Sequence, residues 1–346
     1  MKVALIGPVY PYRGGIAHYT TMLYRALRER GHDVLMVSFK RQYPRWLYPG
    51  RSDKDPSKKP LIVEDAKYWI DSLNPITWLT TFWRIRRYRP DVLVLQWWTT
   101  FWAPVWWTIS VLNRFFLKVP LLYVCHNVLP HETRWWDHWL VRSVLRWGTF
   151  FITQSLEEKR RLLSLLPKAF VFVVPHPIYD MFLNQRLPKE DARKRLGLPA
   201  DALVLLFFGI VREYKGLKDF LLELPLVQNC RQTASRVFLV IAGEFWDDKS
   251  IYLQIIRDLG MEEQVIIDDR YIPNEEVPVF FSAADALIAP YRQKTGSGAI
   301  QLARGMGLPV ISSFFQFFDN RNCLSEPAVQ WADIVDLIES LPSTRQ

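Results

Sequence analysis

Short apolar runs alternate with helical patterns along most of the chain. The first run, residues 3–6, leads into a glycine-rich loop and a helical pattern over residues 16–30, with Leu23 and Leu27 four positions apart. A second run at 34–38 completes a β-α-β unit. Buried strands are also predicted at 91–96, 120–126, 150–153 and 171–174, with helices at 74–88, 139–147 and 157–165, and residues 41–60 are expected to form a surface loop.

The alternation stops near residue 175 and restarts near residue 200. The second series predicts strands at 203–208, 237–242, 265–267, 286–288 and 309–312, and helices at 217–224, 251–259, 277–283, 297–306 and 329–341. Pro225 is expected to end the first of these helices. The pattern therefore predicts an α/β protein with two Rossmann-like domains facing a central cleft, residues 1–175 and 200–346, joined by a connection at 176–199.

Composition narrows the class of protein. The uncharged segment 92–113 is long enough to span a membrane, but Gln96 and Pro104 interrupt it, so a buried strand, a loop and an aromatic helix are expected. Cys125, Cys230 and Cys323 are far apart and lack CxxC spacing, so neither a disulfide framework nor a metal site is expected. The N-terminal apolar run reads as a strand rather than a signal peptide, and we expect a cytoplasmic protein.

Charge and tryptophan are both concentrated in the first half. Residues 1–175 hold 26 Lys and Arg against 12 Asp and Glu, a net +14, whereas the remainder holds 18 against 23, a net −5, which together give the +9 of the whole chain. Of the 15 tryptophans, 13 lie at or before Trp147. This combination fits an anionic membrane surface, at the inner face of the cell membrane. A Trp-rich core under a solvated basic surface is the alternative.

Polar and glycine residues that follow predicted strands are the candidate site. Gly14 and Gly15 precede a helix, where backbone N–H groups can bind an anion, or they form an ordinary tight turn. Arg212 and Lys215 follow the strand at 203–208 and suit a diphosphate, unless they are merely two solvated bases. The loop 291–298 also precedes a helix, in which Ser297 is a candidate N-cap.

Histidines are less decisive. His126 ends an apolar strand, so its ring is expected at the carboxyl edge of the sheet. His18 and His131 are weaker candidates, and a structural, hydrogen-bonded imidazole remains the alternative for each histidine.

In their order and spacing, several segments resemble the GT-B glycosyltransferases of family 4, also called group 1. The matching segments are residues 14–16, 123–126, 173–180, 209–216, 239–244, 271–277, 283–285 and 307–311. The resemblance implies a retaining, metal-independent hexosyltransferase that uses a nucleotide sugar, a UDP- or GDP-sugar, as co-substrate and needs no other cofactor. It also implies an acceptor-binding first domain and a donor-binding second domain.

The resemblance carries over to particular residues. Arg212 and Lys215 would stabilise the departing nucleotide, and His126 would contact the donor sugar. The remaining donor contacts would come from Gly14, Gly15, Gly209, Glu244, Tyr291, Gly296, Ser297 and Gly298. On the acceptor side, the candidates are His18, His131, Trp97 and Trp98, and the charge asymmetry favours a lipid-linked or polysaccharide acceptor of the cell envelope.

Two features keep alternatives open. The family's pair of glutamates in the third motif has no counterpart near residues 294–302, and the C-terminal segment is short, so a non-catalytic sugar-nucleotide or glycan-binding relative is the alternative. A nucleic-acid binder would explain the basic charge but not the second domain. The fingerprint of NAD-dependent enzymes, GxGxxG, is absent.

Overall fold

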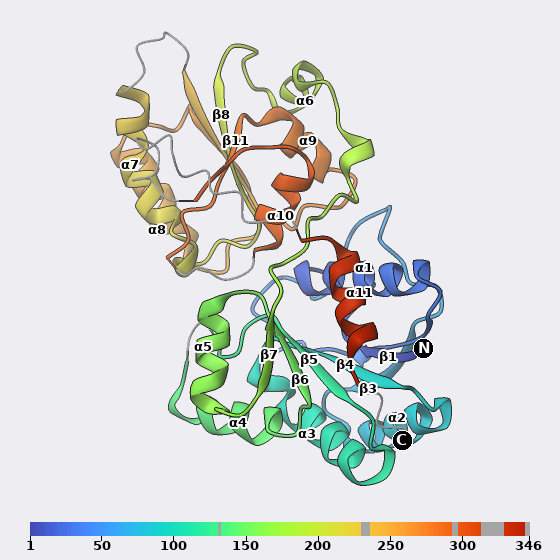
Figure 1. Ribbon diagram of the computed structural model, residues 1–346. Helices are drawn as coiled ribbons and strands as arrows, with labels where there is room; N and C mark the ends of the chain where they lie inside the picture. The colour runs from blue at the N-terminus through green and yellow to red at the C-terminus, as the bar shows by residue number, and fades with distance from the viewer. Residues whose placement is uncertain (131–132, 230–235, 293–296, 313–328, 343–346) are drawn as a thin grey trace. The chain divides into compact units, whose positions relative to one another are not determined.

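The computed structural model describes residues 1–130, 133–229, 236–292, 297–312 and 329–342 (Figure 1). The chain divides into two compact units. Unit 1 comprises Met1–Asp55, Pro60–Pro177 and Val329–Gln346, and unit 2 comprises Pro56–Lys59 and Ile178–Ala328.

Unit 1 is built on a seven-stranded parallel sheet in the order β3-β2-β1-β4-β5-β6-β7. Its strands are β1 (Lys2–Ile6), β2 (Asp33–Arg41), β3 (Lys67–Asp71), β4 (Val92–Trp97), β5 (Leu121–Cys125), β6 (Phe150–Thr153) and β7 (Phe170–Val173). Every residue of β4 and β5 is buried, which matches their continuous apolar sequence. The order reverses between β1 and β4, so ligands of this sheet are expected at the carboxyl ends of these strands.

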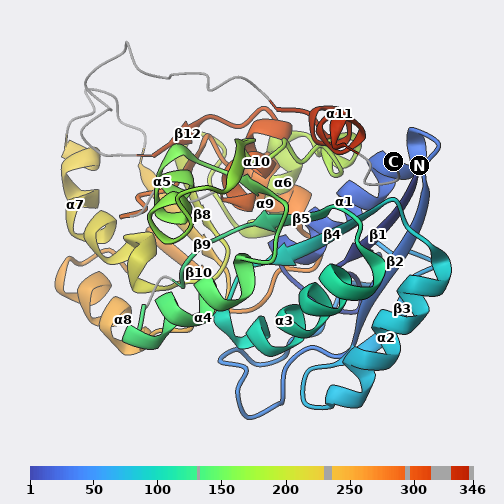
Figure 2. The same ribbon diagram turned by 60° about the horizontal axis from the view of Figure 1, so that its bottom comes forward.

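Helices cover both faces of this sheet. They are α1 (Gly15–Glu29), α2 (Pro75–Tyr88), α3 (Ala103–Leu112) between the short helices η1 (Thr100–Trp102) and η2 (Asn113–Leu117), α4 (Trp135–Leu145), α5 (Leu156–Leu165) and α11 (Trp331–Ser340). Helices α2, α3 and α4 lie side by side on one face, and α1 and α11 lie on the other (Figures 1 and 2). The expected strand, loop and aromatic helix at 92–113 are β4, η1 and α3.

The last helix, α11, belongs to unit 1. Its apolar side, Ile334, Val335 and Ile338, is fully buried, and His32 on the α1 side contacts Glu339 at 2.8 Å. An ion pair between Arg30 and Asp336 adds a second polar contact. The sequence pattern predicts a second domain over residues 200–346, but the packing of α11 against α1 groups Val329–Gln346 with the first unit.

Unit 2 has a five-stranded parallel sheet in the order β10-β9-β8-β11-β12. Its strands are β8 (Leu203–Phe208), β9 (Val237–Ala242), β10 (Val265–Asp268), β11 (Ala286–Ile288) and β12 (Val310–Ile311). Its helices are α6 (Lys189–Leu196), α7 (Leu217–Asn229), α8 (Lys249–Asp258), α9 (Val277–Ala283) and α10 (Gly298–Gly305), with the short η3 (Leu183–Gln185) and η4 (Glu213–Lys215). The fold class, two parallel sheets with interleaved helices, is as predicted.

Several elements differ from the sequence-based prediction. Strand β3 was not predicted, because the exposed Lys67 and Tyr68 interrupt its apolar pattern. Helix α7 continues through Pro225 to Asn229, although proline removes a backbone donor. The segment expected as a connection contains α6, whose buried Arg193 donates to the Asp285 carboxylate at 2.7 Å and so fixes α6 to unit 2.

The segment at 41–60, expected to be a surface loop, makes specific hydrogen bonds at residues 53–55 and again at residues 57–58. Arg13 and Asp55 donate backbone hydrogen bonds that join residues 53–55 to residues 11–13 in unit 1. In unit 2, the Asn274 N–H donates to Ser57 Oγ at 2.8 Å and the Lys58 N–H donates to the Glu275 carboxylate at 3.0 Å. Among the described residues, no helix is both long and apolar enough to cross a membrane.

Candidate functional site

In unit 2, the loops after three adjacent strands converge at the carboxyl edge of the sheet. The loop after β8 pairs with the loop after β9, because the Gly209 N–H donates to Ala242 O and the Val211 N–H to Glu244 O, both at 2.9 Å. Gly243 cannot be replaced without movement, since a Cβ there would lie 2.0 Å from Gly209 O. The loop after β11 joins them through the Arg292 N–H, which donates to Tyr214 O at 3.0 Å.

Lys215 lies at the centre of these loops. Its ammonium group lies 5.3 Å from the centre of the Tyr291 ring, and a Cβ at Gly209 would lie 3.3 Å from its Nζ. Burial lowers the pKa of the Lys215 ammonium below its ordinary value. Within the described part of the chain no carboxylate pairs with this ammonium, which lies against the Tyr291 ring instead. A partly buried cation of this kind is a strong site for an anion.

Arg212 is held in the same way. Its guanidinium lies 5.5 Å from the centre of the Trp246 ring, and the backbone of the two residues is tied through Val211, whose carbonyl accepts from the Trp246 N–H at 3.1 Å. Trp246 is not among the site residues predicted from the sequence. Its position could have indicated a role, because it lies four residues after β9, in the loop that pairs with the Arg212 loop.

Ser297 occupies the N-cap position of α10, as predicted, but its hydroxyl does not cap the helix. It donates instead to the Tyr291 hydroxyl at 3.2 Å, so Tyr291 contacts both Lys215 and the start of α10. Burial raises the pKa of the Tyr291 hydroxyl, which therefore stays protonated. Gly298 begins the helix, Glu244 is buried beside the paired loops, and Gly296 lies outside the described residues.

In unit 1, His126 lies at the carboxyl edge between two glutamines. Its Nε2 is 2.7 Å from Gln96 Oε1, at the end of β4, and its Nδ1 is 3.1 Å from Gln154 Nε2, after β6. The Gln154 amide nitrogen can only donate, so Nδ1 accepts and the proton is on Nε2. A Cβ at Gly7 would lie 2.5 Å from Gln96 Cγ, so only glycine leaves room for this glutamine.

A second buried histidine shares an aromatic neighbour with the first. The Tyr19 ring makes edge contacts with His126 at 4.7 Å, His176 at 5.2 Å and Trp331 of α11 at 5.0 Å between ring centres. Burial, and then the neighbouring His176, lowers the pKa of His126 to about 3, and burial lowers that of His176 to about 4. Both rings are therefore neutral at physiological pH, and both nitrogens of the His126 ring have hydrogen-bond partners.

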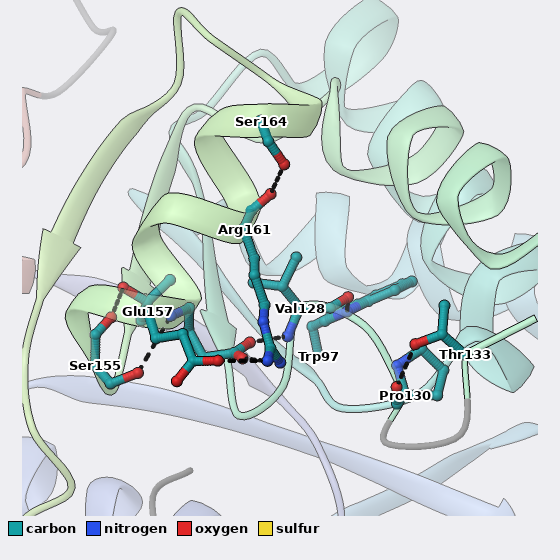
Figure 3. A network of polar contacts seen from close by, with 10 residues as sticks. Trp97, Val128, Pro130, Thr133, Ser155, Glu157, Arg161 and Ser164 are labelled. Carbon is teal, nitrogen blue, oxygen red and sulfur yellow. Dashed lines mark hydrogen bonds and ion pairs between the residues drawn. The ribbon is translucent and has the colours of Figure 1, made fainter. Parts of the chain in front are cut away.

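The loop after His126 is anchored by a polar network (Figure 3). The buried Glu158 carboxylate accepts from the Val128 N–H at 2.5 Å and from Arg161 at 2.9 Å. The Trp97 indole N–H donates to Val128 O at 3.2 Å. Ser155 caps α5 by accepting from the Glu158 N–H at 3.2 Å, which orients that carboxylate.

Of the predicted acceptor residues that the structure describes, the two tryptophans are buried. Trp97 is fully buried as the last residue of β4, and Trp98 is 9% exposed with its indole N–H donating to Tyr43 Oη at 2.8 Å. Core packing therefore explains both. His18 lies in the first turns of α1, where burial lowers its pKa, and His131 lies outside the described residues. Gly14, with φ of 103°, precedes α1, which has neither a side-chain cap nor an acidic residue in its first turn.

Two family models cover most of the chain. The glycosyl transferase 4-like domain matches residues 14–176, and the glycosyl transferases group 1 model matches residues 202–339. The chain belongs to the group 1 glycosyltransferase family. The resemblance read from its motifs is thereby confirmed.

Known relatives of this group 1 glycosyltransferase agree with the assignment. It is 32% identical over 169 residues to D-inositol 3-phosphate glycosyltransferase 1 of Catenulispora acidiphila, a match that covers 47% of this chain and 40% of the relative. It is 26% identical over 195 residues to the GDP-mannose:glycolipid 4-beta-D-mannosyltransferase of Xanthomonas campestris, covering 56% and 50%. The matches thus span half or less of the length of these relatives.

The fold of the group 1 glycosyltransferase is shared with solved structures. Anabaena HepE in complex with UDP and glucose matches with a TM-score of 0.63 at 16% identity, covering 90% of this chain and 80% of HepE. Sucrose-phosphate synthase from Thermosynechococcus elongatus matches with a TM-score of 0.62 at 18% identity, covering 91% and 82%. Both support the GT-B fold class.

Proposed function

We propose that this chain is a retaining hexosyltransferase that moves a sugar from a nucleotide diphosphate sugar to a lipid-linked or polysaccharide acceptor. The observation that carries the proposal is Lys215, a partly buried ammonium with no carboxylate partner among the described residues, beside Arg212 at the carboxyl edge of the unit 2 sheet. Two adjacent cations at this edge suit the two phosphates of such a donor.

In the proposed reaction, the bond between the anomeric carbon and the β-phosphate oxygen breaks, and the acceptor oxygen forms the new bond. The nucleoside diphosphate leaves with additional negative charge, and the acceptor hydroxyl loses its proton. Arg212 and Lys215 stabilise the leaving group electrostatically, which is usually the largest contribution to such catalysis. Because two fixed cations supply this charge, the proposed reaction needs no metal ion.

The remaining unit 2 residues have supporting roles in the proposal. Tyr291 contacts Lys215 through its ring and Ser297 through its hydroxyl, and so keeps the ammonium close to the start of α10. The backbone N–H groups from Gly298 onward are proposed to face a phosphate. Gly209 leaves room for the Lys215 ammonium. Glu244 lies in the loop after β9 and is buried, and its carboxylate is the proposed partner of a donor hydroxyl.

Unit 1 is proposed to bind the acceptor. The roles of His126, Gly14 and Gly15 toward the donor remain predictions. Both nitrogens of the His126 ring are already hydrogen-bonded to glutamine side chains, so a sugar hydroxyl would have to replace one of these two hydrogen bonds. The buried Gln96 amide nitrogen has no hydrogen-bond partner within the described residues, which makes it a second candidate contact for a ligand.

A non-catalytic nucleotide-sugar binder remains the alternative, because no glutamate lies near residues 294–302. Isothermal calorimetry with UDP-, GDP- and ADP-sugars, followed by NMR of the product formed with a lipid-linked acceptor, separates the two. We expect binding of at least one donor and a product with the donor's anomeric configuration. Binding without any transfer supports the alternative, an inverted product refutes retention, and the absence of binding refutes both functions.

Trp246 is expected to position Arg212 rather than to touch the reacting atoms. Replacing Trp246 by leucine removes a cation–π contact of about 1 kcal/mol, so the affinity for the nucleoside diphosphate should fall about fivefold. Trp246→Phe should retain most of the affinity, because a phenyl ring preserves the stacked geometry. Calorimetric titration with UDP or GDP measures both, and equal losses for leucine and phenylalanine would show that ring stacking is not what matters.

A further inference from the structure

The outer surface of helices α2, α3–η2 and α4 carries more exposed apolar groups than a solvated surface requires. We call this surface, formed by residues 75–89, 103–118 and 134–147, the helical face. Its most prominent apolar side chains are Ile76, Trp83, Phe115, Phe116, Trp135 and Trp139. Trp135 is 84% exposed and Trp139, one helical turn later, is 70% exposed. Large exposed aromatic groups of this kind mark an interaction surface.

Part of the helical face is a continuous aromatic strip. The Trp83 ring of α2 lies 5.4 Å from the Phe116 ring of η2, and the next residue, Phe115, lies 6.4 Å from the Trp147 ring after α4. The C-terminal parts of three successive helices are therefore joined by ring contacts. The neighbouring helices α2, α3 and α4 place this strip and the tryptophans of α4 on the same layer of unit 1 (Figure 2).

Basic groups are interleaved with these rings. The Arg86 guanidinium lies 5.3 Å from the Trp83 ring centre, and that of Arg146 lies 5.0 Å from the Trp147 ring centre. The three segments contain nine Lys and Arg residues, all exposed, and a single acidic residue, Asp137. Asp137 is buried and accepts hydrogen bonds from Thr100 and from the backbone of Arg134. The helical face thus presents positive charge without exposed negative charge.

We propose that the helical face binds the surface of an anionic lipid bilayer. Tryptophan suits the headgroup region because its apolar ring inserts while its indole N–H stays hydrated, and phenylalanine adds apolar area to the same layer. Arginine is attracted to anionic headgroups and covers its aliphatic stem with the same apolar layer. The arrangement gives peripheral attachment with the helices lying along the surface, because none of them is long enough to span it.

The charge and the apolar groups of the helical face argue against two other binding partners, a second copy of the chain and a nucleic acid. A second copy of the chain would bring two surfaces of the same sign together, which costs free energy. A nucleic acid would satisfy the arginines, but it offers no apolar layer for the exposed side chains of Ile76, Trp135 and Trp139. The inference deepens the proposed function, since a lipid-linked acceptor would be encountered at this surface.

Vesicle flotation of the full chain tests the proposal without any donor. We expect it to float with vesicles of phosphatidylcholine and phosphatidylglycerol and not with phosphatidylcholine alone, and to be released by high salt. The double variant Trp135→Ser/Trp139→Ser should weaken partitioning at least about tenfold. Arg84→Gln/Arg87→Gln should weaken partitioning about twenty-five-fold, because each arginine near the surface contributes about fivefold.

The matched control is Ile251→Ser/Arg257→Gln, which removes one exposed apolar and one exposed basic side chain from α8 in unit 2. It should float like the wild type. Equal flotation of all variants, indifference to lipid charge, or concentration-dependent self-association that the tryptophan variant abolishes would each overturn the proposal. Thermal melts verify that the variants are folded, and nucleotide binding by the same preparations separates a failure here from a failure of the proposed donor site.

Discussion

Replacing Lys215 by alanine is expected to lower kcat/KM for the nucleotide sugar by at least about a hundredfold, the usual effect of removing one preorganised charge at a leaving group. The ammonium is held between Gly209 and the Tyr291 ring, so it needs no rearrangement to meet a phosphate. Most of the loss should appear in kcat, because the charge on the departing phosphate is largest in the transition state. Steady-state kinetics with the donor identified by calorimetry measures it.

Lys249 provides a matched control for this substitution. Its ammonium also lies over an aromatic ring, 5.5 Å from the centre of Phe245, but it is already paired with the Asp269 carboxylate at 3.1 Å. Lys249→Ala should therefore change kcat/KM by less than about twofold, since its charge is already balanced by a carboxylate and is not available to the donor. Comparable losses in the two variants would contradict the special role of Lys215.

The lowered pKa of Lys215 also gives the reaction an alkaline limit. The ammonium loses its proton at a lower pH than a free lysine does, so transfer should decline as pH rises through that lowered pKa. Lys215→Arg should remove this alkaline limb, because a guanidinium stays charged.

Lowering the pH from 7 to 5 is expected to reduce the free energy of unfolding of unit 1 by roughly 2 kcal/mol for each of two buried histidines. The pKa of His126 is about 3 and that of His176 about 4, whereas both are near 6.5 in the unfolded chain. Below pH 6.5 the unfolded state takes up protons that the native state does not. The stability is therefore lost as pH falls below 6.5, and the loss levels off near the native pKa values.

Urea unfolding followed by tryptophan fluorescence measures this effect, because 13 of the 15 tryptophans lie in the first half of the chain. The window above pH 5 avoids most carboxylate protonation. His126→Gln should be less stable at pH 7 but should lose about half of the pH dependence. His138→Gln, at an exposed position of α4, should behave like the wild type. A wild-type slope in His126→Gln would rule out buried, neutral His126 as the cause.

Much of the fold could be predicted because each buried parallel strand is a continuous run of apolar residues in the sequence. Strands β6, β8 and β9 occur at the predicted residues, since their neighbours on both faces are apolar. Strand β3 has no such apolar run, because it lies at the sheet edge and two of its five residues, Lys67 and Tyr68, are exposed. Helix α6 is short and highly charged, and it is ordered by tertiary contacts that no local pattern reveals, among them those of Arg193 with Asp285 and with Ala283 O.

The candidate site was predictable in its position but not in its internal contacts. Arg212 and Lys215 follow β8 directly, and the carboxyl edge of a parallel sheet is fixed by the strand pattern. The rings that hold them, Trp246 and Tyr291, come from loops more than 30 residues away, so no local spacing reveals the pairing. Trp97 is a candidate for the acceptor side on its sequence, with a Trp-rich core as the alternative, and as the last residue of β4 it is fully buried.

The docking of α11 against α1 has a consequence for how the protein is made. Residues 178–328 leave the ribosome between the two parts of unit 1, so unit 2 can fold as soon as its sequence emerges, while unit 1 waits for its last helix. Until then the nascent chain carries Tyr19 without Trp331 beside it, and the surface that receives Ile334 and Ile338 stays in contact with water. The half-finished first unit, rather than the second, is thus the species that a chaperone would be expected to protect.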